Sequence, residues 1–218
     1  MDPKTILDKI SEGRQYRNFD VRELRALDDE SSYIVEGYAA TFGQPYVLWS
    51  YDGYTVREQI DASAFDNADM TDVIMQFDHE GRVFARVSNK TLQLTIDSRG
   101  LKIRADLGGT EIGRQLHAEI KGGYINKMSI GFKVKEDKRD RVEDHELGTV
   151  DILRTITKIS KLYDVSAVSI PANGATEISA RSFGEGVIEE LMQERQAQEK
   201  RERQRKKIKI LMEVNKWI

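Results

Sequence analysis

The chain has 218 residues, of which 39% are hydrophobic and 33% are charged, and its formal net charge at pH 7 is −3. This length and balance indicate one sizeable globular core with room for an appendage, and the small negative charge offers no electrostatic argument for nucleic acid binding. The absence of cysteine excludes disulfides, thiolate metal sites and cysteine nucleophiles.

The first part of the chain changes from a polar stretch to strand-forming sequence. Residues 1–15 are expected to form a flexible arm. From Tyr16 onward, β-branched and aromatic runs alternate with turn residues, and the clearest hairpin has strands at 91–96 and 101–107. Many short strands with few helices predict a mainly β domain of the α+β class over residues 16–183, built as a barrel or a sandwich.

One helix is predicted in the middle of this domain, and it leads into a strand of special interest. Thr110 is a suitable N-cap for the helix, and Gly122-Gly123 ends it. In the strand at 128–134, apolar residues alternate with small or polar ones, which places Ser129 on the face opposite the core. Gly131 leaves room beside it. Ser129 is therefore a candidate nucleophile, although most serines on strands are only solvated.

Two charged stretches are expected to lie outside the core. Residues 135–146 carry mixed charge and are predicted to form a mobile surface loop between two strands. Residues 184–218 contain nine Lys or Arg, seven Glu and no Pro, which predicts a charged helical tail with an apolar far end. Such a helix should dock on this domain or on a partner.

Three histidines are candidates for proton transfer. His79 ends an apolar strand, whereas His117 in the helix and His145 in the charged loop are expected at the surface. A neutral imidazole suits the removal of a serine proton near pH 7, and it benefits from an acceptor that fixes its tautomer. Asp164 is an acid within a mostly apolar strand, where an unpaired carboxylate is costly to bury, so it is expected to face a partner or solvent and is a candidate acceptor.

These residues on their own lead to a serine hydrolase on a β domain. The order His79, Ser129, Asp164 differs from the chymotrypsin, subtilisin and α/β-hydrolase orders, and no Gly-x-Ser-x-Gly motif occurs. The sequence has no zinc-binding helix motif, P-loop or dinucleotide fingerprint, so no cofactor and no metal are expected. A metallohydrolase that uses the three histidines is a minor alternative, because none has a recognised ligand spacing.

Five segments in chain order carry a family resemblance over about residues 16 to 180. They are Glu36–Gly43, Ile60 with Ala64-Phe65, Met75–His79, Gly123 with Met128–Phe132, and Leu162–Ser166 leading to Pro171-Ala172-Asn173. With these segments the chain resembles the prohead (capsid maturation) proteases of tailed bacteriophages, a family related in fold to the herpesvirus assemblins. The implied fold is a closed antiparallel β-barrel of the herpesvirus-protease type, with the charged helical tail added.

The resemblance implies a serine endopeptidase in which Ser129 attacks the peptide carbonyl and His79 acts as general base and then as acid. Asp164 takes the position of the third member, where many family members have Glu. In the herpesvirus relatives a His has this role, so His117 or His145 is a less favoured candidate. Backbone N–H groups are the expected oxyanion donors.

The resemblance also implies partners and a location. The expected substrates are the scaffold protein and the major capsid protein, cleaved inside the procapsid in the host cytoplasm, and a homodimer is suggested by analogy. The tail would contact scaffold or be removed by the enzyme itself. No nucleic acid or membrane partner is expected, since no apolar run approaches about 18 residues and no signal-peptide core follows Met1. The alternative function is a catalytically inactive, scaffold-binding capsid assembly protein with the same fold.

Overall fold

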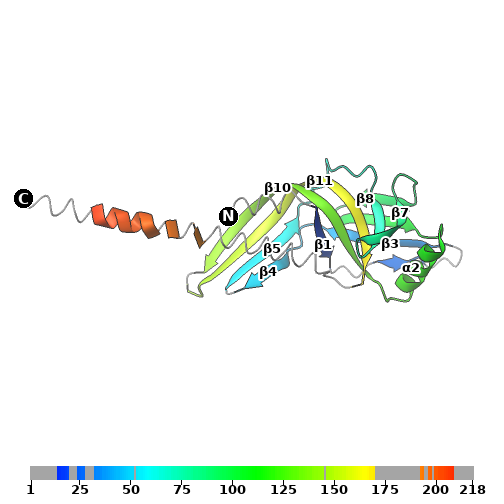
Figure 1. The fold of residues 1–218 in the computed structure, drawn as a ribbon, viewed down its shortest axis with the longest axis horizontal. Helices are drawn as coiled ribbons and strands as arrows, with labels where there is room; N and C mark the ends of the chain where they lie inside the picture. The colour runs from blue at the N-terminus through cyan, green and yellow to red at the C-terminus, as the bar shows by residue number, and fades with distance from the viewer. Residues whose placement is uncertain are drawn as a thin grey trace, which may run out of the picture.

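Two β-sheets contain most of the residues in this computed structural model (Figure 1). The structure describes residues 14–19, 24–27, 32–51, 53–144 and 146–169, and in the tail 192–193, 196–197 and 199–208. The mainly β, α+β character predicted from the sequence is confirmed.

The larger sheet is organised around a long hairpin of two strands, β10 and β11. Its seven strands are β1 (Gln15–Phe19), β4 (Tyr46–Tyr51), β5 (Tyr54–Ile60), β6 (Ile74–Phe77), β7 (Glu80–Arg86), β10 (Lys127–Asp144) and β11 (Thr149–Val168). The order is β1-β10-β11-β5-β4, and β6 joins β11 farther along, with β7 beside it. β1 and β10 run antiparallel, whereas β5 and β6 both run parallel to β11.

The smaller sheet packs beside it and contains the predicted hairpin. Its strands are β2 (Arg25–Ala26), β3 (Ile34–Thr41), β8 (Leu92–Ile96) and β9 (Gly100–Asp106), in the order β2-β3-β9-β8. β8 and β9 are antiparallel, and the Asp97 carboxylate caps their turn by accepting hydrogen bonds from the backbone of Arg99 and Gly100. The hairpin prediction is confirmed.

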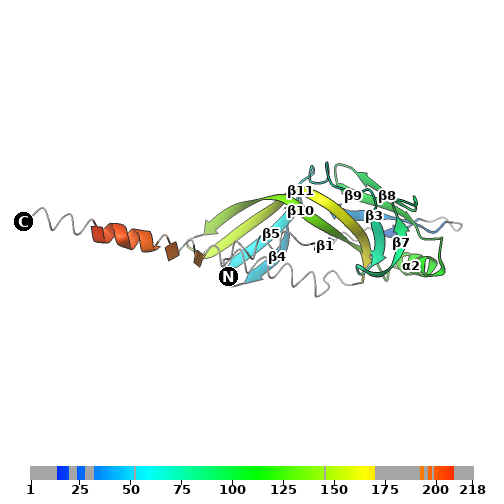
Figure 2. The same cartoon turned by 45° about the horizontal axis from the view of Figure 1, so that its top comes forward.

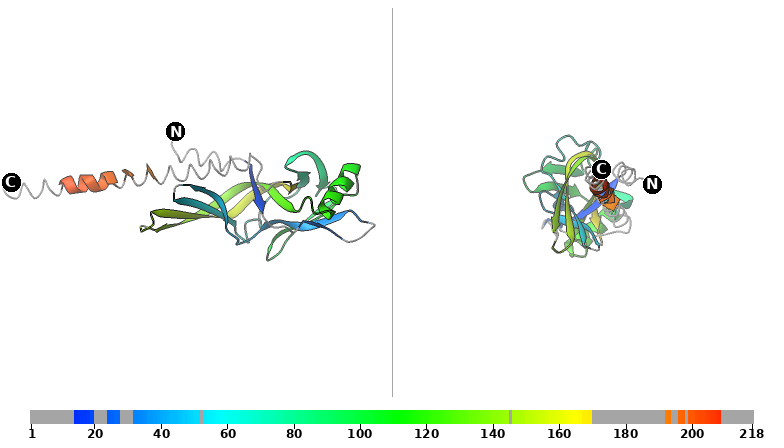
Figure 3. Two further views of the ribbon diagram at one scale, coloured as in Figure 1. Left: turned by 90° about the horizontal axis from the view of Figure 1, so that it is seen from below. Right: turned by 90° about the vertical axis from the view of Figure 1, so that its left-hand side faces the viewer.

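The hydrophobic core forms where apolar residues of both sheets meet the helix. The predicted placement of the apolar residues of β10 is confirmed, since Met128, Ile130 and Phe132 are fully buried in this core. Helix α2 (Glu111–Lys121) begins after the Thr110 N-cap and packs beside β2 and β3, at the end of the molecule away from β4 (Figure 3). His117, expected at the surface, is instead buried with its ring edge-on to Tyr33.

The predicted closed antiparallel barrel is wrong for the described residues, where no strand pairing closes either sheet. The reason lies in the length of β11. Its first half pairs with β5 and its second half, from Asp164, pairs with β6, so the larger sheet forks along β11 instead of wrapping around. Both of these pairs are parallel, so the sheet is mixed rather than antiparallel.

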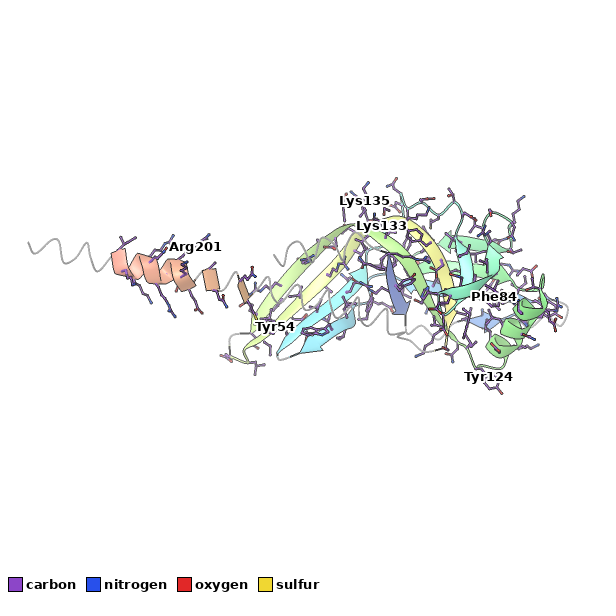
Figure 4. All side chains as sticks on the ribbon, in the orientation of Figure 1. Tyr54, Phe84, Tyr124, Lys133, Lys135 and Arg201 are labelled. Carbon is purple, nitrogen blue, oxygen red and sulfur yellow. The ribbon has the colours of Figure 1, made fainter. Side chains whose placement is uncertain are left out.

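The predicted loop at residues 135–146 is also wrong, because β10 continues through it to Asp144. Four register shifts between Gly131 and Asp137 bend the hairpin, so that its outer half extends with β4 and β5 as an arm (Figure 2). Lys133 and Lys135 lie at the top of this bend (Figure 4). Cross-strand ion pairs, such as the one between Lys158 and Glu136, let a charged sequence form a strand.

The two ends of the chain are described only in part. Arg14 and Gln15 are the described residues of the expected arm, and Gln15 begins β1. The rest of the arm lies outside the described residues, as does the apolar far end of the tail. The described tail residues are helical and exposed. In the described part of the chain, no helix is long and apolar enough to span a membrane.

Candidate active site

Ser129 lies on β10 between β1 and β11, opposite Asn18 on one side and Ser166 on the other. Residues directly opposite each other in a sheet point to the same face, so the side chains of Ser129 and Ser166 share a face away from the core. The sequence placed Ser129 on this face correctly. It is not open, however, because Ser129 is 0% exposed.

Gly131 has the role that the sequence suggested, which is to leave room beside the serine. It pairs with Asp164 on β11, and a Cβ atom on Gly131 would lie 2.1 Å from Asp164 Oδ2. The carboxylate therefore occupies the space that a larger residue would fill. This arrangement places Asp164 on the same face as Ser129.

His79 reaches this face from a tight turn between β6 and β7. Asp78 and His79 have φ of 48° and 61°, which makes a two-residue turn of the kind that joins closely paired antiparallel strands. Non-glycine residues adopt such positive φ at an energetic cost, so other contacts must hold the turn. The Asp78 carboxylate accepts hydrogen bonds from the backbone N–H and the hydroxyl of Ser169, just past the end of β11.

The three predicted site residues form one hydrogen-bonded chain. His79 Nε2 lies 2.5 Å from Ser129 Oγ, and His79 Nδ1 lies 2.5 Å from Asp164 Oδ1. Residues separated by 50 and 35 positions therefore converge, because β10 and β11 are neighbours and β6 delivers the His79 turn to the far half of β11. Asp164 is 0% exposed and the His79 side chain 3%.

Two further donors hold the Asp164 carboxylate. The Ser166 hydroxyl donates to Oδ1 at 2.7 Å, and the Arg14 guanidinium forms an ion pair with Oδ2. Asp164 therefore reaches the histidine despite the short arm of an aspartate side chain. His117 lies on α2 against Tyr33, outside this cluster, and His145 lies outside the described residues.

The electrostatic environment keeps the His79 imidazole neutral. Burial, together with the positive charge of Arg14, lowers the pKa of His79 from 6.5 to about 4. A neutral imidazole with Nδ1–H directed at Asp164 presents Nε2 as an acceptor toward Ser129. The arrangement can therefore take the serine proton, which is what a nucleophilic hydroxyl requires.

The family model of the caudovirus prohead serine protease matches residues 18–185, well over half of the chain. The chain belongs to the caudovirus prohead serine protease family. No curated protein shows significant similarity to it. No solved structure does so either.

One feature of this prohead protease family member was missed by sequence reasoning. Behind the β1–β10 pair, a buried ionic cluster joins Arg17, Glu58 and Arg154, with a 2.5 Å contact from Arg17 Nε to Glu58 Oε1. Burial favours the neutral form of Glu58, but the two guanidinium groups outweigh it and hold its pKa at about 2. In the sequence of β5, Glu58 is in phase with Val56 and Ile60, so the period of two places it on their buried face and was the signal that could have identified it.

Proposed function

We propose that this chain is a serine endopeptidase that cleaves the scaffold protein and the major capsid protein inside the phage procapsid, in the host cytoplasm, during head maturation. The observation that carries the proposal is the unbroken contact from Ser129 through His79 to Asp164. Membership of the prohead serine protease family supports both the reaction and the setting.

The reaction assigns one role to each residue. Ser129 Oγ attacks the carbonyl carbon of the substrate while His79 Nε2 takes its proton, and the same nitrogen then gives that proton to the departing amine. Water, deprotonated by His79, cleaves the resulting ester and releases the new carboxylate. Asp164 holds Nδ1–H and stabilises the imidazolium during both steps, and Ser166 positions Asp164.

The test is co-expression of this chain with the capsid protein of the same phage, followed by intact-mass analysis. Wild type is compared with Ser129→Ala and with Ser63→Ala, whose exposed hydroxyl donates to Asp61. Capsid protein should be shortened by wild type and by Ser63→Ala, and left whole by Ser129→Ala. Whole capsid protein in all three samples, despite assembled shells, would favour the inactive assembly protein instead.

The proposal extends to the charged tail, which would bring the enzyme to the scaffold. The charged segment 184–218, whose described residues are helical, suits contact with scaffold helices, and the enzyme would later remove it. Prolonged incubation of the purified chain at high concentration should shorten it within the tail. A tail that stays intact in wild type, as it would in Ser129→Ala, would contradict this self-removal.

A further inference from the structure

The edge strand β1 lies beside β10 (Figure 1), and together with Arg14, the residue before it, contacts every member of the proposed triad. The contacts are an ion pair of Arg14 with Asp164, a ring contact of Tyr16 with His79 at 4.4 Å between centroids, and a hydrogen bond from Ser129 Oγ to the carbonyl oxygen of Arg17 at 3.0 Å. One short segment thus covers all three groups that proteolysis would use.

The contact at Ser129 competes with catalysis. A serine hydroxyl has one hydrogen, and two acceptors lie within reach of it, His79 Nε2 and the Arg17 carbonyl oxygen. A hydroxyl that donates to Arg17 cannot give its proton to His79 at the same time. Because Ser129 is also 0% exposed, a protein substrate reaches it only after β1 has moved.

The contact of Arg14 with Asp164 also opposes catalysis. A triad carboxylate helps by stabilising the imidazolium that forms during the reaction. The Arg14 guanidinium balances that carboxylate, and its positive charge opposes protonation of His79. While Arg14 is in place, His79 is therefore a weaker base than Asp164 alone would make it.

The position of β1 allows it to leave. It has five residues, and in the described part of the chain it is the end strand of the larger sheet, hydrogen-bonded to β10. Its departure would expose the edge of β10 at residues 128–132, which includes Ser129. An exposed edge of this kind binds an extended peptide as an added strand. The edge of β10 that β1 covers therefore has the form of a substrate site.

The side chain of Arg17 shows what such a peptide would carry. It is 2% exposed, and its Nε and Nη2 atoms contact the two carboxylate oxygens of Glu58. Without Arg17, Glu58 would keep its contact with Arg154, which Asp137 shares, and would lose the donors from Arg17 Nε and Nη2. The vacated position would face both carboxylate oxygens of Glu58, which a planar, two-pronged guanidinium matches best.

We propose that β1 occupies the substrate-binding edge of β10 as an intramolecular substitute for substrate, and that a protein substrate replaces it there with an arginine against Glu58. The proposal rests on the proteolytic function proposed above. In the β1 register Asn18 lies opposite Ser129, so the bond presented to the serine is the one that follows the arginine. Hydrolysis there adds water, which leaves a carboxylate on the arginine and an amine on the next residue.

The first test measures how fast a fluorophosphonate probe labels Ser129 in the full-length chain, followed by intact mass. Arg14→Gln removes the charge that holds β1 on Asp164 and should raise the labelling rate about tenfold or more, as loss of a partly buried charge pair implies. Arg57→Gln is the matched control, since its ion pair with Asp151 lies on the arm, and it should label at the wild-type rate. Ser129→Ala should not label.

The second test uses a capped peptide with the sequence of residues 14–19 as substrate for Arg14→Gln. A partner peptide has norleucine in the place of Arg17. The arginine peptide should be cleaved after that arginine, with kcat/KM at least about tenfold higher than the norleucine peptide. Glu58→Gln in the same background should reduce the preference. Because Glu58 also contacts Arg154 and Tyr46, a thermal melt checks that the Glu58→Gln variant is folded. The comparison of the two peptides does not depend on this variant, because it leaves Glu58 unchanged.

The outcomes separate the two proposals. Labelling of wild type and Arg14→Gln at equal rates would overturn the role of β1 while leaving the protease intact. Equal cleavage of both peptides would overturn the arginine pocket. Absence of labelling in every variant, with the fold preserved, would overturn the proteolytic function itself.

Discussion

Asp164→Asn is the change that tests the triad most directly. Asn keeps the shape of Asp but loses its negative charge. Its side chain has one acceptor oxygen, which can accept either from His79 and Ser166 or from Arg14. Arg14 is one-third exposed and can turn toward solvent, so the Asn oxygen is expected to stay on His79. The main loss is then the attraction between the carboxylate and the imidazolium that forms in the transition state.

The size of that loss follows from Coulomb's law. Two unit charges about 4 Å apart interact by about 4 kcal/mol at an effective dielectric constant of 20. At about 1.4 kcal/mol for each factor of ten, the rate should fall about 10³-fold, and toward about 10⁴-fold if the Asn instead turns its amide to His79 and fixes the wrong tautomer.

The assay is the second-order rate of fluorophosphonate labelling of Ser129, with a thermal melt to check the fold. The control is Asp151→Asn. Asp151 lies on β11, as Asp164 does, but forms an exposed ion pair with Arg57 of β5, so this variant should label at the wild-type rate. Loss of the Arg14 contact would also loosen β1 and speed labelling, so the measured decrease understates the catalytic effect. A folded Asp164→Asn protein that labels within tenfold of wild type would refute the role of Asp164.

Three further predictions concern the support of the site. Gly131→Ala places a methyl group 2.1 Å from Asp164 Oδ2, so it should destabilise the fold by about 1–3 kcal/mol in urea titrations and slow labelling, whereas Gly109→Ala, with open space around it, should do neither. Asp78→Ala removes both bonds to Ser169 and should slow labelling about tenfold, and Asp78→Asn, which keeps an acceptor and tolerates positive φ, should recover most of the rate. The pKa of His79 is lowered to about 4 in the fold, so the unfolded chain binds more protons between pH 6.5 and 4, and stability should fall by up to about 3 kcal/mol as the pH drops through that window. Urea titrations should show less of this decrease in His79→Gln, and equal slopes in both proteins would contradict it.

The sequence predicted local features well where a short-range rule governs them. The placement of the apolar residues around Ser129, the β8–β9 hairpin and the Thr110 cap each depend on neighbours within a few residues, and each was confirmed. The convergence of Ser129, His79 and Asp164 came from the family resemblance, since no periodicity relates residues 35 and 50 positions apart. Spacing alone yielded only a list of candidate residues.

The errors share a physical cause, which is that pairing between distant strands overrides local composition. Residues 135–144 look like a solvated loop because they are charged, but their pairing with β11 makes them a strand. Glu58 was not identified from the sequence, because Arg17 and Arg154, which neutralise it on the buried face of β5, come from distant parts of the chain. The barrel was wrong because nothing in the sequence of β11 shows that one strand pairs with two parallel neighbours in succession.

The dependence of the site on β11 has a consequence for the timing of synthesis. This strand supplies Asp164, holds the His79 turn through the adjacent Ser169, and pairs with β6, whose sequence lies about ninety residues earlier. Contacts of such large sequence separation form late in folding. A nascent chain on the ribosome therefore carries Ser129 and His79 well before it can align them. Under the proposed function, the newly made polypeptide cannot cleave other chains until nearly the whole domain has emerged.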